Sequence, residues 1–188
     1  MRVYQKLAVA TAGLALGFTT VDAIPAQAAV LQYDFVVNIP ETPFSEKPLQ
    51  GSTGSGFFTY DDAATPVFDP FGVGYVGVIN LEFNFLGNTF TASDDVGFSS
   101  GVTDIPFPSV GLKDGIFQGL NYVVTSTSSK NIGFYFTASE SAFFVGRGAR
   151  GSRNEAGGNP VSAAGLSSGG EGLSEGEVTY SFQGPACH

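Results

Sequence analysis

The chain has 188 residues, of which 43% are hydrophobic and 13% charged, and its formal net charge is -9 at pH 7. This composition excludes a disordered tail, a coiled coil and a collagen, and the acidic balance argues against nucleic-acid binding through a basic surface. The chain has one Cys and one His, the adjacent Cys187 and His188, so we expect no zinc cluster, disulfide framework or nucleophile-histidine pair.

The N-terminal segment has the order of features of a secretory signal peptide. Arg2 and Lys6 precede an apolar run over residues 7–21, and a triplet of small residues follows before the expected cleavage point. A helix of that run rises only about 22 Å, less than the roughly 30 Å hydrocarbon core of a bilayer, so we expect no permanent membrane span. We predict that residues 1–28 are removed, and that residues 29–188 form a single secreted domain.

After the signal segment, apolar residues recur at every second position, which is the period of a strand with one buried face. The clearest strand lies within residues 78–91, where Ile79, Leu81, Phe83 and Phe85 share a face, and a Gly-Asn turn at residues 87–88 predicts a tight hairpin. The other predicted strands are residues 31–39, 54–61, 110–112, 116–117, 120–125, 132–137, 142–145 and 178–182.

Short strands separated by turn residues are typical of an antiparallel β-sandwich, and a jelly-roll-like arrangement is the form we expect. Residues 146–176 are an exception, because they are rich in Gly and Ser. Their small apolar surface does not offset the entropy lost on ordering, so we predict a long flexible loop there.

Two pairs of acidic residues are candidates for a metal site. Asp61 with Asp62 and Asp94 with Asp95 each follow a predicted strand, where carboxylates and nearby carbonyls can ligate Ca²⁺. The competing interpretation is that Asp is common where strands end and turns begin. Glu82 projects from the polar face of a strand and is interpreted as solvated rather than as a catalytic acid, since no partner carboxylate is evident. We expect no other cofactor.

Three arginines, Arg147, Arg150 and Arg153, form a basic cluster in an otherwise acidic chain. Glycines between them allow the backbone to wrap around an anion, so the cluster is a candidate site for a sulfate, a uronate or an acidic partner. The alternative is that these charges only keep a glycine-rich loop solvated.

Aromatic side chains in the loops are candidates for sugar binding, because flat rings stack against the apolar faces of sugars. The candidate platforms are Phe68, Phe71, Tyr75 and Tyr122, in a chain that has no Trp. The alternative for all four rings is packing in the core or at its edge.

The segments YDFVVNI, GSGFFTYDD, LEFNFLGNTFTASDD, DGIFQGLNYVV and VTYSF, together with the signal peptide, resemble secreted bacterial proteins of the PEP-CTERM type, such as those of cyanobacteria. The resemblance covers most of residues 30–182 and implies export. Proteins of this type normally end in a Pro-Glu-Pro signal, an apolar span and a basic cluster that sort them to the cell surface. This chain departs from that pattern at its C-terminus, which implies release into the periplasm or medium. The resemblance assigns no functional residue.

We therefore expect an exported, non-catalytic structural or binding module of the cell envelope or extracellular matrix. The alternatives are a carbohydrate-binding module and, less favoured by the residues, a glycan-acting hydrolase. The partners we expect are polysaccharides or envelope components rather than nucleic acid.

Overall fold

The structure is a computed structural model that describes residues 29–41, 49–97, 105–138, 142–153, 164–167 and 172–186. The expected signal peptide of residues 1–28 and the terminal pair Cys187 and His188 lie outside these ranges. In the part of the chain that is described, no helix is both long enough and apolar enough to cross a membrane.

The expectation of an all-β protein is confirmed. Strands and one short 3-10 helix, η1 (Ala92–Asp94), make up the regular structure of the described residues. β-branched and aromatic residues at every second position favour extended backbone, because their side chains pack well on one face of a pleated strand. The strands are β1 (Val30–Asn38), β2 (Thr53–Asp61), β3 (Val67–Phe68), β4 (Val73–Phe85), β5 (Asn88–Thr91), β6 (Ser109–Lys113), β7 (Ile116–Val124), β8 (Ile132–Thr137), β9 (Ala142–Arg147), β10 (Arg150–Arg153), β11 (Ala164–Ser167) and β12 (Ser174–Pro185).

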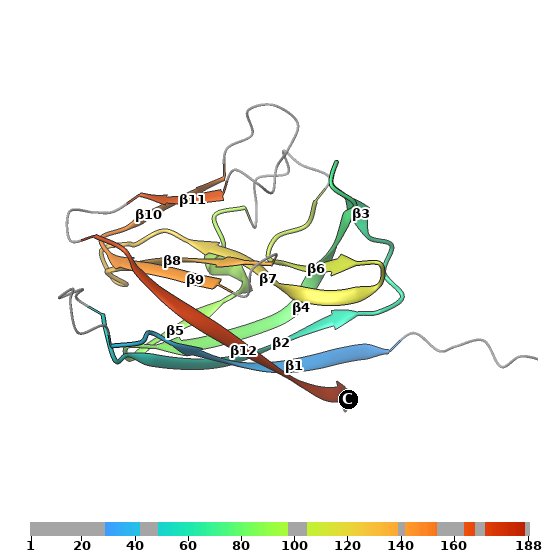
Figure 1. Cartoon of the computed structure of the whole chain (residues 1–188), viewed down its shortest axis with the longest axis horizontal. Helices are drawn as coiled ribbons and strands as arrows, with labels where there is room; N and C mark the ends of the chain where they lie inside the picture. The colour runs from blue at the N-terminus through green and yellow to red at the C-terminus, as the bar shows by residue number, and fades with distance from the viewer. Residues whose placement is uncertain are drawn as a thin grey trace, which may run out of the picture.

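Eight of the strands close into an antiparallel barrel (Figure 1). Their order is β2-β1-β12-β9-β8-β7-β6-β4, and β4 pairs in turn with β2, so the sheet closes on itself. β3 and β5 pair with β4 outside this closed path. The expected β-sandwich, including its jelly-roll-like form, is therefore wrong.

The pairing of β2 with β4 is what makes the sheet a barrel. Gly56 of β2 lies so close to β4 that a Cβ there would clash with the carbonyl oxygen of Glu82 and with the ring of Phe35. Only glycine permits this approach of the two backbones. The alternation of side chains did not reveal the pairing, because inward and outward positions alternate in a sandwich and in a barrel alike.

Aromatic rings fill the inside of the barrel. Phe83 of β4 is fully buried, and its ring centroid lies between 5.3 and 6.2 Å from the centroids of six other Phe rings, which come from β1, β4, β5, β8 and β9. A barrel of eight strands has an interior just wide enough for side chains to fill. The barrel axis is therefore occupied by core, and a ligand site has to be sought at the ends or on the outer surface.

The hairpin predicted within residues 78–91 is confirmed, with two differences. The turn consists of Leu86 and Gly87, which both have positive φ, of 49° and 74°, so it lies one residue earlier than expected. Ile79 lies where the register between β2 and β4 shifts, and its side chain is 58% exposed instead of sharing the buried face of Leu81. A bulge places an extra residue in one strand and so breaks the alternation that the sequence pattern assumes.

The stretch of residues 146–176, expected as one long loop, contains strands in its described part. β10 and β11 pair with each other and pack on the outside of the barrel against β7 and β8 (Figure 1). Gly151 of β10 lies so near Val123 of β7 that a side chain there would clash. Backbone hydrogen bonds hold such a small sheet with few apolar side chains, so low apolar content did not prevent strand formation.

Candidate functional site

The four candidate aromatic platforms divide into two exposed and two buried residues. Phe68 and Phe71 are 66% and 70% exposed, whereas Tyr75 is 3% exposed and Tyr122 is fully buried. The Tyr122 hydroxyl donates a hydrogen bond of 2.6 Å to the carbonyl oxygen of Thr91, and burial raises the pKa of Tyr122 far above its usual value. The expectation of an exposed platform is therefore wrong for Tyr75 and Tyr122, because both rings pack in apolar clusters. A ligand role for the other two rings stays a prediction.

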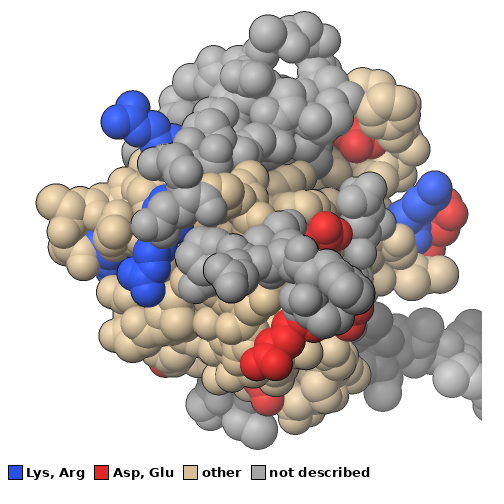
Figure 2. Space-filling view, turned by 60° about the vertical axis from the view of Figure 1, so that its left-hand side comes forward, with Lys and Arg blue, Asp and Glu red and all other residues tan. Residues whose placement is uncertain are grey.

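The described arginines lie near one end of the barrel. Arg147 ends β9 and Arg150 begins β10, and both side chains are exposed. Arg153 is the last residue of β10, and its side chain is outside the described part. In Figure 2, Lys and Arg lie at both the left and the right of this face, and Asp and Glu lie mainly toward its middle and right. Anion binding by the arginines stays a prediction.

The first acidic pair lies at the end of β2. The side chain of Asp61 accepts a hydrogen bond of 2.9 Å from the backbone N–H of Ala63, and Asp62 accepts one of 2.8 Å from that of Ala29. These contacts hold the chain at the place where β1 begins and β2 ends. The bond of Asp61 is the usual role of Asp in a turn, whereas that of Asp62 joins two segments distant in sequence.

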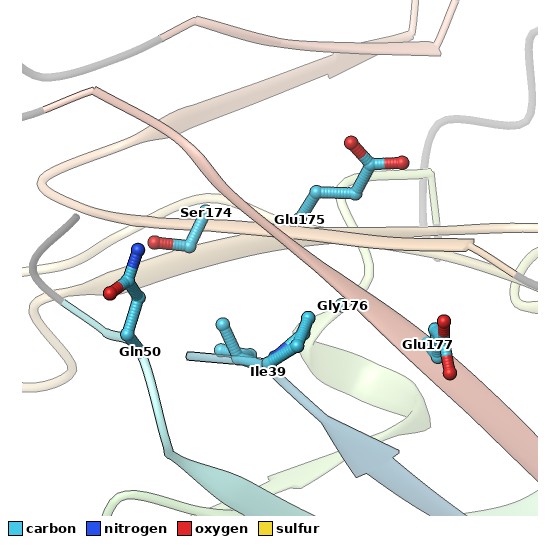
Figure 3. Close-up of a pocket in the computed structure, with 7 residues that line it drawn as sticks. Ile39, Gln50, Ser174, Glu175, Gly176 and Glu177 are labelled. Carbon is cyan, nitrogen blue, oxygen red and sulfur yellow. The ribbon is translucent and has the colours of Figure 1, made fainter. Parts of the chain in front are cut away.

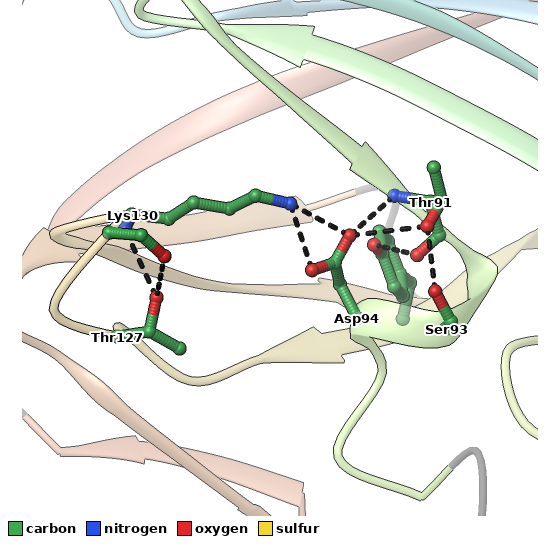
Figure 4. A network of polar contacts seen from close by, with 7 residues as sticks. Thr91, Ser93, Asp94, Thr127 and Lys130 are labelled. Carbon is green, nitrogen blue, oxygen red and sulfur yellow. Dashed lines mark hydrogen bonds and ion pairs between the residues drawn. The ribbon is translucent and has the colours of Figure 1, made fainter.

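The second acidic pair lies beside the far end of β7, and Asp94 belongs to a network of polar contacts (Figure 4). Both carboxylate oxygens of Asp94 contact the Lys130 ammonium, at 2.9 and 3.0 Å. Asp95, which is 5% exposed, accepts hydrogen bonds from the backbone N–H groups of Val123, at 3.0 Å, and Gly97, at 2.6 Å. The carboxylate of Asp95 thus joins the segment that follows η1 to the end of β7.

The two acidic pairs therefore do not come together, since they lie at opposite ends of the barrel. Within the described ranges, no group of three or more His, Cys, Asp or Glu residues is arranged to hold a metal ion. Glu82 accepts a hydrogen bond of 2.8 Å from Asn84 on the exposed face of β4, as a solvated polar residue does. Calcium binding by either acidic pair stays a prediction.

A pocket of about 210 Å³ lies at the end of the barrel where β1 ends and β12 begins. We call it the β12 notch (Figure 3). Sequence reasoning did not find this pocket. Its lining residues are Ile39, Pro40, Gln50, Ser174, Glu175, Gly176 and Glu177.

The notch exists because β1 ends opposite Glu177, so the first three residues of β12 have no partner from β1. The register between the two strands stops at Asn38 opposite Glu177, and Ile39 instead exchanges backbone hydrogen bonds with the turn that follows, at 3.0 and 2.8 Å. Residues 174–176 of β12 keep their pairing with β9 on one side only. Their other edge faces the notch, and such an edge presents backbone N–H and C=O groups in alternation.

Ser174 is the most informative residue of the notch. It is 1% exposed, and its hydroxyl has no hydrogen-bond partner in the structure. In Figure 3 the side chains of Ser174 and Gln50 point toward one another across the pocket. A buried hydroxyl without a partner costs about 1–3 kcal/mol, which a suitable ligand group recovers.

The charge of the notch is negative. Glu175 and Glu177 are exposed on the outward face of β12, and none of the lining residues is Lys or Arg. The alternation of Ser174, Gly176 and Val178 with these two glutamates continues the predicted strand backwards from residue 178. That pattern was available from the sequence, whereas the approach of residues 39–40 and 50 was not.

Comparison of the chain with models of protein families, with curated proteins and with solved structures found no match. The resemblance to exported PEP-CTERM proteins stays a prediction. Among the described residues, the β12 notch is the feature whose geometry points to a function.

Proposed function

We propose that the protein is an exported, non-catalytic binding module and that the β12 notch is its ligand site. The observation that carries this proposal is the buried Ser174 hydroxyl, which lines a pocket and has no partner within the structure. Buried polar groups in folded proteins nearly always have a hydrogen-bond partner, so an exception at a pocket favours a ligand or an ordered water as the partner.

The remaining features of the notch support binding of a small molecule. The pocket combines apolar contacts from Ile39 and Pro40 with convergent polar groups from Gln50 and β12. Ligand sites commonly have this composition, an apolar wall with a few placed polar groups. The barrel interior offers no comparable place, because the Phe rings occupy it.

The non-catalytic part of the proposal rests on the setting of the carboxylates. A glycosidase needs a general acid that an apolar environment keeps protonated near neutral pH. Glu175 and Glu177 are both exposed to solvent instead. Export is supported by the signal-peptide pattern of residues 1–28, and predicts a secreted protein whose first residue is Ala29.

One observation favours a glycan-acting hydrolase as the second candidate. Glu175 and Glu177 project from the same face of β12 two residues apart, which separates their Cα atoms by roughly 6.7 Å. Paired catalytic carboxylates lie about 5 to 9.5 Å apart. Reproducible release of sugar from a glycoside panel, abolished by Glu175→Gln or Glu177→Gln, would establish this candidate and overturn the non-catalytic proposal.

A fragment screen by NMR tests the proposed site. Amide signals of the ¹⁵N-labelled full chain are recorded with mixtures of small polar fragments. We expect the shifts to concentrate at Gln50 and residues 174–177, and to weaken in Ser174→Ala but not in the remote control Phe71→Ala. Shifts confined to another surface, or no shift with any fragment, would refute the notch as the ligand site.

A further inference from the structure

We infer that the ligand of the β12 notch is an uncharged, hydroxyl-rich ring, in chemical terms a neutral sugar unit, and that Glu175 and Glu177 exclude anionic sugars from it. This inference rests on the proposed function, because it names the class of ligand for the same site.

The size of the notch suits a single ring. Its volume is about 210 Å³, whereas an engineered apolar cavity of about 150 Å³ accommodates benzene. A six-membered ring with hydroxyl substituents is somewhat larger than benzene and fits this volume. Two or more sugar units in one chain would have to extend beyond the described walls of the notch.

The hydrogen-bonding groups of the notch select for hydroxyls. The open edge of residues 174–176 presents both donors and acceptors, and the Ser174 hydroxyl can donate or accept. An ammonium group only donates and an anion only accepts, so each satisfies part of this set. A hydroxyl both donates and accepts, and several hydroxyls on one ring satisfy all of these groups together.

The apolar wall fits the same ligand. Pro40 is exposed and Ile39 is buried, and both contribute to the lining. The C–H face of a sugar ring packs against such a surface while its hydroxyls point toward β12. This combination needs both an apolar and a polar side of the ligand, which a simple cation lacks.

Charge distinguishes neutral from acidic sugars. Two glutamates and no Lys or Arg are among the lining residues, so a uronate placed there meets nearby like charge. The exposed arginines Arg147 and Arg150 lie on β9 and β10 and do not line the notch. Binding of a uronate by those arginines would therefore appear at a different set of residues.

The test uses three sugars of one ring size that differ in charge. D-glucose, D-glucuronate and D-glucosamine are titrated to 50 mM into the ¹⁵N-labelled full chain at pH 7. We expect glucose to shift the amide signals of residues 174–177, with glucuronate at least tenfold weaker at these residues. The double variant Glu175→Gln with Glu177→Gln should bind glucuronate within threefold of glucose.

Ser174→Ala separates a ligand contact from a structural role. Because the hydroxyl has no partner within the protein, its removal should leave the melting temperature unchanged or raise it, while glucose binding weakens about fivefold. Loss of folding stability in Ser174→Ala would mean that the hydroxyl is a structural group, and would overturn its assignment to the ligand.

The other outcomes are decisive in different ways. If glucosamine binds at the notch more than tenfold more tightly than glucose, or if only acyclic amine fragments bind there, the inference of a neutral sugar ligand is wrong. The notch then remains the ligand site. If fragments and sugars alike leave residues 174–177 unshifted, the inference and the proposed function both fail.

Discussion

Replacing Asp95 by Ala removes a buried carboxylate that joins the segment after η1 to the end of β7. The carboxylate accepts hydrogen bonds from the backbone N–H groups of Val123 and Gly97. The adjacent backbone adds a hydrogen bond of 2.9 Å from Val96 N–H to the Val123 carbonyl oxygen. The substitution therefore leaves the backbone N–H groups of Val123 and Gly97 without this acceptor.

The magnitude follows from the burial and charge of this acceptor. A hydrogen bond to a charged group contributes about 1.5–3 kcal/mol, and Asp95 is only 5% exposed, so solvent screens its two bonds little. We expect Asp95→Ala to lower the free energy of unfolding by about 3–4 kcal/mol. For a domain of this size, that loss corresponds to a fall in melting temperature of roughly 6–16 °C.

Asp94 provides the matched control, because it is the neighbouring residue of the same type. Its ion pair with Lys130 is about one-quarter exposed on each side, at 27% and 26%. Partly exposed ion pairs contribute about 0.2–1 kcal/mol, and the bond from the Thr91 N–H to Asp94 adds a similar amount. We expect Asp94→Ala to cost only about 1 kcal/mol, and 1 M NaCl to reduce that difference while leaving the Asp95→Ala effect intact.

Urea unfolding followed by far-UV circular dichroism measures both variants against the unmodified chain, which has no Trp for a fluorescence assay. The slope of the unfolding free energy with urea should be the same for all three proteins. A cost for Asp94→Ala equal to or larger than that for Asp95→Ala would refute the conclusion that the buried Asp95 carboxylate is the stronger link between this segment and β7.

Three further predictions concern the core, the tyrosines and calcium. Phe83→Ala should lower the unfolding free energy by about 3–5 kcal/mol and exposed Phe71→Ala by under about 0.5 kcal/mol, measured in urea. Burial, aided by Tyr33, raises the pKa of Tyr60 from 10.0 to about 12. Protonated Tyr60 therefore contributes fully to the free energy of unfolding below pH 10, and this contribution is lost as pH rises through 12. If Tyr60→Phe leaves the dependence of the unfolding free energy on pH unchanged, this prediction is wrong. Calcium binding predicts a melting temperature that rises with CaCl₂, and less so in Asp62→Asn; no rise ends that hypothesis.

Several elements were predictable from short stretches of sequence. The hairpin over residues 78–91 and the strands predicted at residues 120–125 and 132–137 all follow from alternation and turn residues. The predictions that were wrong have identifiable causes. Ile79 lies at a bulge, and residues 150–153 form a strand through backbone pairing rather than apolar content.

The candidate site, too, was only partly predictable from the sequence. The sequence pattern places Ser174 and Val178 on one face of a strand and Glu175 and Glu177 on the other. It does not show that β1 diverges after Asn38 and leaves one edge of β12 open. The sequence likewise does not show whether the Tyr122 ring is exposed or buried. Its packing against Phe134 and Phe136, which removes it from solvent, is seen only in the structure.

The amino-acid sequence alone determined that this protein is built of short antiparallel strands, since alternation, β-branched residues and turn signals act within a few residues of chain. Only the tertiary structure decided that these strands close into a barrel, that aromatic rings fill it, and that Asp95 and Asp94 have different roles. The physical reason is that each of these features depends on contacts between residues distant in sequence, as between β2 and β4 or between Asp95 and Val123. Local side-chain pattern does not specify which distant strands become neighbours.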